Sequence, residues 1–340
     1  MDPESLLLKR WDNLSDLHEG TSFTRVFRAG QVLFGKRRAY QRKVSLPDFD
    51  GICSGDILVF QPKNVELLPE FLPYLVQSDG FFDHALGTSA GSLSPRTKWQ
   101  ELAKYEFSLP PIAEQRRTVQ LMNRSYSILS EYQVAKKRSL ELKNALMNQW
   151  LNGSELDNEK VLGDVAYLNP GGIRINADDP FVPMDSLPLL GRRPAYFEKK
   201  GDRGGIRANA KDILFARITP CLENGKIGQV PEEIPVCGGS TEIIVIRTKG
   251  EVSQDLIFHW ATFTSIRKRA SELMIGTTGR QRLMAEDLGA LPFRQLSSAA
   301  EIFFVAKLNQ LEKLSNRLTR VIEDSSRAAS VLREMLLRGE

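Results

Sequence analysis

Two stretches of the chain, Ile57-Leu58-Val59-Phe60 and Ile243-Ile244-Val245-Ile246, match each other at an offset of 186 residues (243 − 57 = 186). Each apolar run follows a cluster of small residues, Cys53-Ser54-Gly55 in the first case and Gly238-Gly239-Ser240 in the second. A short apolar run bounded by small residues is typical of a buried strand. The two stretches therefore predict two related strands, one in each half of the chain.

Further matches keep the same order along the chain. Downstream, Gln100-Glu101-Leu102 matches Glu286-Asp287-Leu288 at the same offset (288 − 102 = 186). Upstream, Val32-Leu33-Phe34 matches Ile213-Leu214-Phe215 at an offset of 181 (213 − 32 = 181), which indicates five extra residues in the second copy. We interpret the chain as an internal duplication, and a duplicated unit usually brings a duplicated site and a pseudo-two-fold arrangement.

Each copy ends in a long helical pattern, at residues 112–151 and 299–337. Apolar residues recur there at alternating spacings of four and three, as in a coiled coil. They are Val119, Met122, Tyr126, Leu129, Leu140, Met147 and Trp150 in the first pattern, and Phe304, Leu308, Leu311, Leu318, Ile322, Ala329, Leu332 and Leu336 in the second. Because either helix alone would leave this row of apolar side chains exposed to water, we expect the two helices to pack together in antiparallel directions. Each would span roughly 60 Å at about 1.5 Å per residue. Two helices of a larger bundle are the alternative.

Before each helix, short β-rich runs alternate with turn residues and a helical stretch, for example at residues 212–218, 241–247 and 255–274. The expected fold class is therefore α/β (mixed), with two globular domains separated by a pair of long antiparallel coiled-coil helices. The expected boundaries are 1–110 for the first globular domain, 111–153 for the first helix, 154–297 for the second domain and 298–340 for the second helix.

Bulk composition permits several functions and favours none strongly. The 340 residues carry 46 Lys+Arg against 42 Asp+Glu, a net charge of +4, which allows a nucleic-acid ligand without requiring one. Three cysteines without paired metal-ligand spacing fit a reduced compartment better than disulfides or zinc. No apolar run approaches a membrane span of about 18 residues, and Met1-Asp2-Pro3-Glu4 does not open a signal peptide. We expect a cytoplasmic location.

Basic loops occur at corresponding places in the two copies. Lys36, Arg37, Arg38, Arg42 and Lys43 surround Tyr40 after the first predicted strand, and the corresponding stretch of the second copy holds Arg217, Asn224 and Lys226. Loops at 92–99 and 277–282 add a second basic element to each copy. Cations can neutralise phosphates, while Arg and Gln can make paired hydrogen bonds to guanine and adenine. A single cluster of this kind is more often only a solvated surface, but the recurrence at matching positions favours DNA binding.

Enzymatic motifs are weak in this sequence. The segment Gly201-Asp202-Arg203-Gly204-Gly205 matches neither a Walker loop nor a dinucleotide fingerprint, and no Asn/Asp-Pro-Pro-aromatic element of an amino-methyltransferase occurs. Asp185, Glu198 and Lys200 loosely resemble the acidic pair and lysine of a metal-dependent nuclease, so a nuclease remains one alternative. A coiled-coil adaptor whose globular units bind protein is the other.

Four stretches resemble the DNA specificity (S) subunit of type I restriction–modification systems. They are Leu162-Gly163-Asp164-Val165, the run from Lys211 to Lys226, Gly238-Gly239-Ser240-Thr241-Glu242 before a strand, and Leu109-Pro110-Pro111-Ile112-Ala113-Glu114-Gln115 at the head of a helix. Each element alone would be weak, but together with the repeat they cover nearly the whole chain.

The resemblance implies two target-recognition domains, each reading one half of a bipartite sequence in double-stranded DNA. It further implies a non-catalytic subunit that docks methyltransferase (M) subunits, two in number, and restriction/translocase (R) subunits. No cofactor is expected in this chain, because S-adenosylmethionine, ATP and Mg²⁺ would be bound by those partners. The candidate DNA-binding residues are Lys36, Arg37, Arg38, Tyr40, Arg42, Ser94, Arg96 and Lys98 in the first domain, and Arg217, Asn224, Lys226, Thr278, Arg280 and Gln281 in the second.

One feature departs from the pattern of the family. The second unit has 52 positions from Val161 to Ile213 (213 − 161 = 52), whereas 31 residues precede Val32. By this alignment the first domain lacks about twenty residues, including any counterpart of Leu162-Gly163-Asp164-Val165. Three explanations stay open: a shortened chain, a misassigned start, or a first domain that opens differently.

Overall fold

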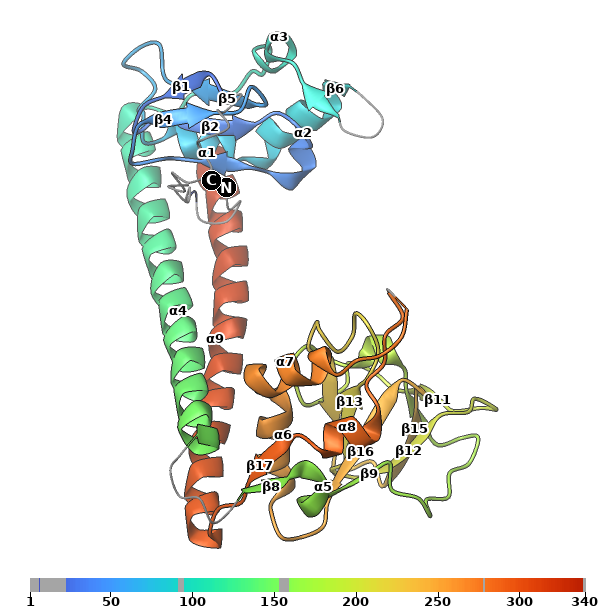
Figure 1. The fold of residues 1–340 in the computed structure, drawn as a ribbon. Helices are drawn as coiled ribbons and strands as arrows, with labels where there is room; N and C mark the ends of the chain where they lie inside the picture. Colours follow the sequence, from blue (N-terminus) through green and yellow to red (C-terminus); the bar gives the residue numbers. More distant parts are fainter. Residues whose placement is uncertain (1–5, 7–22, 91–94, 153–158, 278, 339–340) are drawn as a thin grey trace. The chain divides into compact units, whose positions relative to one another are not determined.

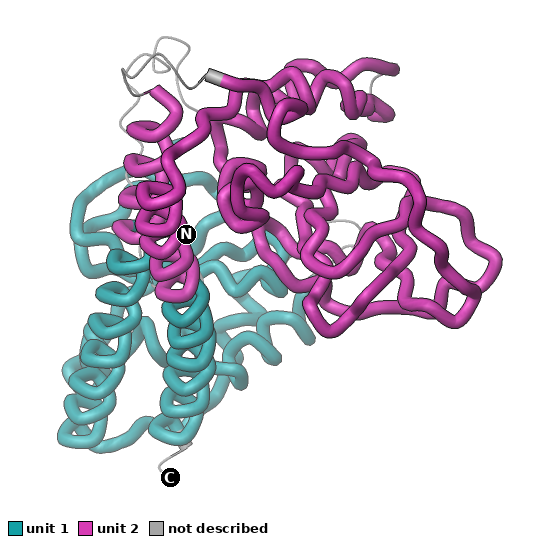
Figure 2. Tube along the Cα trace, turned by 90° about the horizontal axis from the view of Figure 1, so that it is seen from below, with its two compact units in different colours: residues 1–137, 316–340 teal, residues 138–315 magenta. Residues whose placement is uncertain are grey.

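The computed structural model describes residues 6, 23–90, 95–152, 159–277 and 279–338. The chain divides into two compact units, residues 1–137 with 316–340 (unit 1) and residues 138–315 (unit 2), coloured separately in Figure 2. The division falls inside two long helices, α4 (Ile112–Asn152) and α9 (Ser298–Arg338), so each helix contributes to both units. Within the described ranges, no helix is long and apolar enough to cross a membrane.

The helices α4 and α9 pack against each other in antiparallel directions, as the heptad pattern predicted (Figure 1). In unit 1, Met122 near the start of α4 belongs to the same apolar cluster as Leu332 and Leu336 near the end of α9. In unit 2 the order is reversed, and Trp150 packs on Phe304 with ring centroids 5.7 Å apart. Both helices have 41 residues and begin 186 positions apart (298 − 112 = 186).

One expected position of the helical seam was wrong. Leu140 is 44% exposed, while the neighbouring Ser139 is buried. Met122, Leu129, Met147 and Trp150 are buried as predicted. The apolar seam of α4 is therefore interrupted by a small polar residue around Ser139, and Leu140 points to the solvent side.

Unit 2 is built on two antiparallel-rich sheets with short helices against them. One sheet has the order β14-β13-β16-β9 and the other the order β11-β10-β15-β12. Their strands are β9 (Ala166–Leu168), β10 (Pro180–Val182), β11 (Glu198–Lys199), β12 (Ile206–Asn209), β13 (Ile213–Ala216), β14 (Ile227–Gln229), β15 (Val236–Gly239) and β16 (Ile243–Thr248). All four residues of β13 are buried, because both faces of this central strand are covered.

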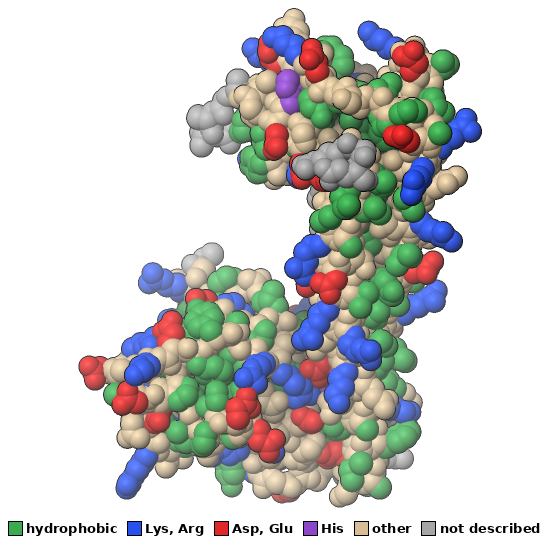
Figure 3. All heavy atoms as spheres, turned by 180° about the vertical axis from the view of Figure 1, so that it is seen from behind, with side chains coloured by type: hydrophobic (Ala, Val, Ile, Leu, Met, Phe, Trp, Pro, Cys, Tyr) green, Lys and Arg blue, Asp and Glu red, His purple; other side chains and the backbone are tan. Residues whose placement is uncertain are grey.

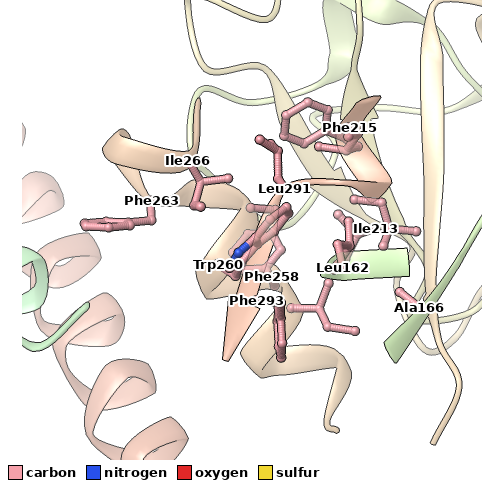
Figure 4. Packing of buried hydrophobic residues seen from close by; sticks show 14 of the residues in the cluster. Leu162, Ala166, Ile213, Phe215, Phe258, Trp260, Phe263, Ile266, Leu291 and Phe293 are labelled. Carbon is pink, nitrogen blue, oxygen red and sulfur yellow. The ribbon is translucent and has the colours of Figure 1, made fainter. Parts of the chain in front are cut away.

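Short helices and a two-stranded ladder close the core of unit 2. The remaining elements are β8 (Glu159–Val161), α5 (Leu162–Val165), η4 (Met184–Ser186), α6 (Gln254–Thr262), α7 (Thr264–Glu272), α8 (Ala285–Gly289) and β17 (Pro292–Arg294). Figure 4 shows Trp260 of α6 next to Phe293 of β17, with Leu162 and Ile213 also in the cluster. The single helix expected over 255–274 is two helices, because Phe263 adopts an extended conformation and is buried.

Unit 1 repeats the central part of this arrangement. Its elements are β1 (Arg25–Phe27), β2 (Val32–Gly35), η2 (Ala39–Gln41), β3 (Val44–Ser45), β4 (Gly51–Cys53), β5 (Ile57–Phe60), α1 (Leu72–Val76), α2 (Asp79–Gly87), β6 (Ser89–Ala90), β7 (Arg96–Thr97) and α3 (Trp99–Leu102). The pair Phe34↔Leu58 of β2 and β5 corresponds to Phe215↔Ile244 of β13 and β16, at the offsets of 181 and 186 found in the sequence. The internal duplication is thus confirmed at the central strand pair of each unit.

The two units differ at one edge of the central sheet. In unit 2, β9 pairs with β16 on the side away from β13. Among the described residues of unit 1, no strand occupies the corresponding edge of β5. Phe107 is 40% exposed, whereas Phe293, its counterpart at the offset of 186, is 1% exposed. The described part of unit 1 thus contains no counterpart of α5, β8 and β9.

Candidate nucleic-acid interface

A tight hairpin carries the basic loop of unit 2. Ile275 and Arg282 exchange both backbone hydrogen bonds, at 3.0 and 2.9 Å, and the backbone N–H of Arg280 donates to the carbonyl of Thr277 at 2.9 Å. Gly276 has φ of 134°, and a Cβ at this position would lie 2.8 Å from the carbonyl oxygen of Arg280. A glycine is therefore required here, and the turn exposes the Arg280 side chain at its tip.

The hairpin is joined to the segment that follows β13. The N–H of Leu283 donates to the carbonyl of Arg217 at 2.8 Å, and the N–H of Thr219 donates to the carbonyl of Gln281 at 3.0 Å. These bonds bring three candidate residues, Arg217, Arg280 and Gln281, to one place in the fold. Thr278 lies outside the described residues.

An ion pair fixes the base of the hairpin. Arg282 donates from Nε and Nη2 to the carboxylate of Glu242, which directly precedes β16. The Arg282 hydrogen bond holds the pKa of Glu242 below its ordinary value. Since the guanidinium is engaged with a carboxylate, Arg282 orients the loop and is less available to phosphates.

Unit 1 contains the same arrangement. The N–H of Thr97 donates to the carbonyl of Lys36, the N–H of Arg38 donates to the carbonyl of Pro95, and Arg37 forms a β-bridge with Arg96. Arg96 donates to Asp56 at 3.1 Å, and both residues lie 186 positions before Arg282 and Glu242 (282 − 96 = 186; 242 − 56 = 186). Lys98, exposed, follows β7 and precedes α3. Ser94 lies outside the described residues.

The loop after β2 presents an aromatic side chain between two residues with positive φ. Arg38 and Arg42, with φ of 56° and 47°, flank the 3-10 turn η2, and Tyr40 within it is 56% exposed. The Arg42 side chain donates to the carbonyl of Gln77 at 2.9 Å and pairs with Asp79 at 2.6 Å. Arg42 therefore ties this loop to the start of α2, while Tyr40 faces solvent.

The corresponding stretch of unit 2 holds one candidate with an exposed side chain and two whose side chains donate to other groups of the protein. Asn224 is exposed, whereas Nζ of Lys226 donates to the carbonyl of Met184 at 2.8 Å. Nη2 of Arg217 donates to Sδ of Met284 at 3.3 Å. Asn224, Arg280 and Gln281 thus offer uncharged and charged donors, and Lys226 and Arg217 are held by the protein.

The side chains of the nuclease alternative have other partners. Asp185 accepts a hydrogen bond from the Tyr196 hydroxyl at 2.6 Å, and this bond lowers the pKa of Asp185. Glu198 forms an ion pair with Arg203. Across the described ranges, no group of three His, Cys, Asp or Glu side chains is arranged to hold a metal ion.

Basic and acidic side chains are interspersed over the face shown in Figure 3, as expected for a net charge of +4.

Comparisons with known proteins agree with the sequence motifs. No protein-family model matches the chain. A type I restriction enzyme EcoDI specificity subunit of Escherichia coli is 28% identical over 107 residues, which are 32% of this chain and 23% of that relative's length. A chain from a structural study of complex assembly and conformational transition in the type I R-M system has a TM-score of 0.58 at 19% identity, covering 94% of this chain and 83% of its own.

A second solved structure gives the same result. The S subunit of a type I restriction–modification system from M. genitalium has a TM-score of 0.56 at 13% identity and covers 92% of this chain and 84% of its own. The structural likeness establishes the fold of two mixed domains with long helices. In sequence and in fold, the chain resembles the specificity subunits of type I restriction–modification systems, as its motifs predicted.

Proposed function

We propose that this chain is a non-catalytic specificity subunit that binds a bipartite sequence in double-stranded DNA. The proposal rests mainly on one observation, the repeated clamp formed by Arg96 with Asp56 and by Arg282 with Glu242. Each clamp ties a basic hairpin to the residue before a central strand, and backbone hydrogen bonds join the hairpin to a second basic loop. Each unit therefore has its own candidate reading face. Two equivalent faces in one chain suit a target with two halves. The resemblance to specificity subunits leads us to expect a fixed gap between the halves of the target.

The chemistry of these faces fits DNA better than a small substrate. Asn224, Arg280 and Gln281 of unit 2 can donate to base edges, as can the exposed Arg38 of unit 1, and Lys36 and Arg37 can neutralise phosphates. Tyr40 offers a flat surface for stacking. On the grounds of sequence alone, Ser94 and Thr278 stay candidates for DNA contacts. Lys98 is a candidate for a phosphate contact, and Arg96 stays a candidate although Asp56 engages it.

We further propose that the helices dock the partner subunits. Exposed apolar side chains lie on α9 both in unit 2, at Ile302 and Phe303 with 73% and 64% exposure, and in unit 1, at Val331 with 59%. Exposed apolar residues of this kind favour protein contacts. Two methyltransferase subunits, and through them the restriction subunits, would supply S-adenosylmethionine, ATP and Mg²⁺ in the cytoplasm.

A selection experiment tests this function. The chain, alone and with its methyltransferase partner, is incubated with a randomised duplex pool over a series of salt concentrations. We expect enrichment of two short sequences at a constant spacing and an affinity that falls with salt, because phosphate contacts release counterions. Affinity that does not depend on salt or sequence would favour the coiled-coil adaptor. Metal-dependent cleavage lost in Glu198→Ala would favour the nuclease.

A further inference from the structure

Two leucines stand exposed beside the candidate reading loop of unit 2. Leu189 is 64% exposed and Leu190 is 50% exposed. Their segment, Pro188 to Gly191, lies next to the loop that carries Asn224 and Lys226, since Leu189 and Lys226 form a β-bridge. Large apolar side chains thus lie among the polar groups that the proposed function assigns to DNA.

The backbone of this segment is held on both sides of Leu189. The N–H of Leu190 donates to the carbonyl of Gly225 at 2.9 Å, and the N–H of Ile227 donates to the carbonyl of Pro188 at 3.1 Å. Leu190 has φ of 51°, a left-handed conformation that is strained for a branched side chain. Gly225 has φ of 87°, and a Cβ there would lie 3.1 Å from Cγ of Leu190. Strain at an exposed position that the surroundings enforce often accompanies a functional contact.

The end of the segment is anchored in the body of unit 2. Arg192 donates to Asp255 on α6 at 2.7 Å and to Asn309 and Glu312 on α9, each at 3.0 Å. Its guanidinium lies 4.1 Å from the ring centroid of Phe258. The leucine pair therefore projects from a rigid support, and its backbone needs little ordering when the side chains meet a ligand.

The apolar feature that double-stranded DNA presents in the major groove is the C5-methyl group of thymine. Resting on the function proposed above, we propose that Leu189 contacts a thymine methyl group in the half-site read by unit 2. Leu190, Gly225 and Arg192 are positioning residues for this contact. Asn224 and Gln281 supply hydrogen bonds to neighbouring base edges, so that the face reads methyl groups and polar edges together.

Replacing thymine with uracil removes only the methyl group, and so tests the contact directly. The full chain with its methyltransferase partner is titrated with the selected duplex, in which each thymine of the half-site is replaced in turn. Wild-type protein is expected to bind about three- to fivefold more weakly at one uracil position, because one methyl group is no longer buried. Leu189→Ala should bind the thymine duplex more weakly and should not distinguish thymine from uracil at that position.

Two further variants complete the test. Val65→Ala, at a 90% exposed position of unit 1, should retain the wild-type response to uracil. Arg192→Lys keeps the positive charge but loses the planar guanidinium that makes several hydrogen bonds at once. The ratio of its affinity for the thymine duplex to its affinity for the uracil duplex should therefore fall, while its affinity for non-specific duplex is unchanged.

Several outcomes would overturn the proposal. They are a wild-type protein indifferent to every uracil, a selected half-site without any A·T pair, and a Leu189→Ala variant that keeps the wild-type response. Leu189 would then serve a protein contact or face only solvent. Failure of the proposed function itself has a different signature, because wild-type protein would show no sequence-dependent binding even to thymine-containing duplex.

Discussion

Arg282 binds the carboxylate of Glu242 through contacts of 2.7, 2.9 and 3.0 Å, and the two residues are 40 positions apart in the chain. Arg96 and Asp56, 186 positions earlier, repeat this pair. In both units the acidic residue directly precedes a central strand and the arginine ends a basic hairpin. The ion pair thus couples each candidate reading loop to the most regular part of its domain.

The clamp predicts how loop order depends on pH. Arg282 lowers the pKa of Glu242 from its ordinary value of 4.5. The stabilising effect of the ion pair is therefore fully present above pH 4.5, and it is lost as the pH falls through the lowered pKa of Glu242. We expect the protection factors of the hairpin amides, which compare observed with intrinsic exchange rates, to fall over that acidic range in wild-type protein. Glu242→Gln should show fast exchange already at neutral pH, and an unchanged exchange rate in this variant would contradict the clamp.

Arg280 is expected to read sequence. It is exposed at the hairpin tip, where a guanidinium can make paired hydrogen bonds to guanine. Arg280→Ala should cost roughly 1–3 kcal/mol of binding free energy on the preferred duplex and relax the preference at one base pair. Titration of matched and mismatched duplexes measures this. Lys268→Ala, on α7, serves as an exposed control, and an equal loss on all duplexes would make Arg280 a phosphate contact.

His259 should make unit 2 sensitive to acid. Its side chain is fully buried, and burial together with Lys143 lowers its pKa from 6.5 to about 4, although Asn309 and Glu312 oppose the shift. Because the unfolded chain takes up the proton first, stability is highest above pH 6.5 and falls as pH drops towards 4. The resulting decrease in the free energy of unfolding should reach at most about 3 kcal/mol.

Denaturant unfolding at pH 7.5 and pH 5 measures this effect. His259→Gln can keep a hydrogen bond to Asn309 and has no proton to gain, so its stability should change less between the two values. If the variant and the wild-type protein lose equal stability, another group is responsible for the pH dependence.

The packing of α4 predicts that truncating two of its apolar residues changes the free energy of unfolding by very different amounts. Met147 is fully buried, whereas Leu140 is 44% exposed. Met147→Ala should lower the free energy of unfolding by about 2–5 kcal/mol because it leaves a cavity. Leu140→Ala should change it by less than about 0.5 kcal/mol, since a surface side chain loses little on truncation. Thermal and denaturant unfolding provide the test, and similar losses in both variants would be inconsistent with the observed packing.

The repeat and the helices could be predicted from the sequence because they follow local patterns. The offset of 186 relates strands with the same register, and the heptad spacing identified Met122 and Met147 as buried positions. The exposure of Leu140 could not be predicted, since the spacing alone does not distinguish it from Ser139.

Individual site residues depended on contacts that no motif indicates. Arg42 looks like a free cation in the sequence, but Gln77 and Asp79, more than thirty positions away, engage it. Leu189 and Leu190 belong to no periodic pattern, and only the bonds to the distant 225–227 segment place them at the candidate interface. The acidic partners Asp56 and Glu242 could have been found from the sequence, because they occupy matching positions of the repeat.

We propose that each unit reads one half of the DNA target, and a comparison of one variant from each unit tests this. Wild-type protein, Arg38→Ala and Arg280→Ala, each with the methyltransferase partner, are used to select from the same randomised duplex pool. We predict that Arg38→Ala weakens enrichment of one half only, that Arg280→Ala weakens enrichment of the other half only, and that the gap stays constant. Loss of the same half in both variants, or of both halves together, would contradict it.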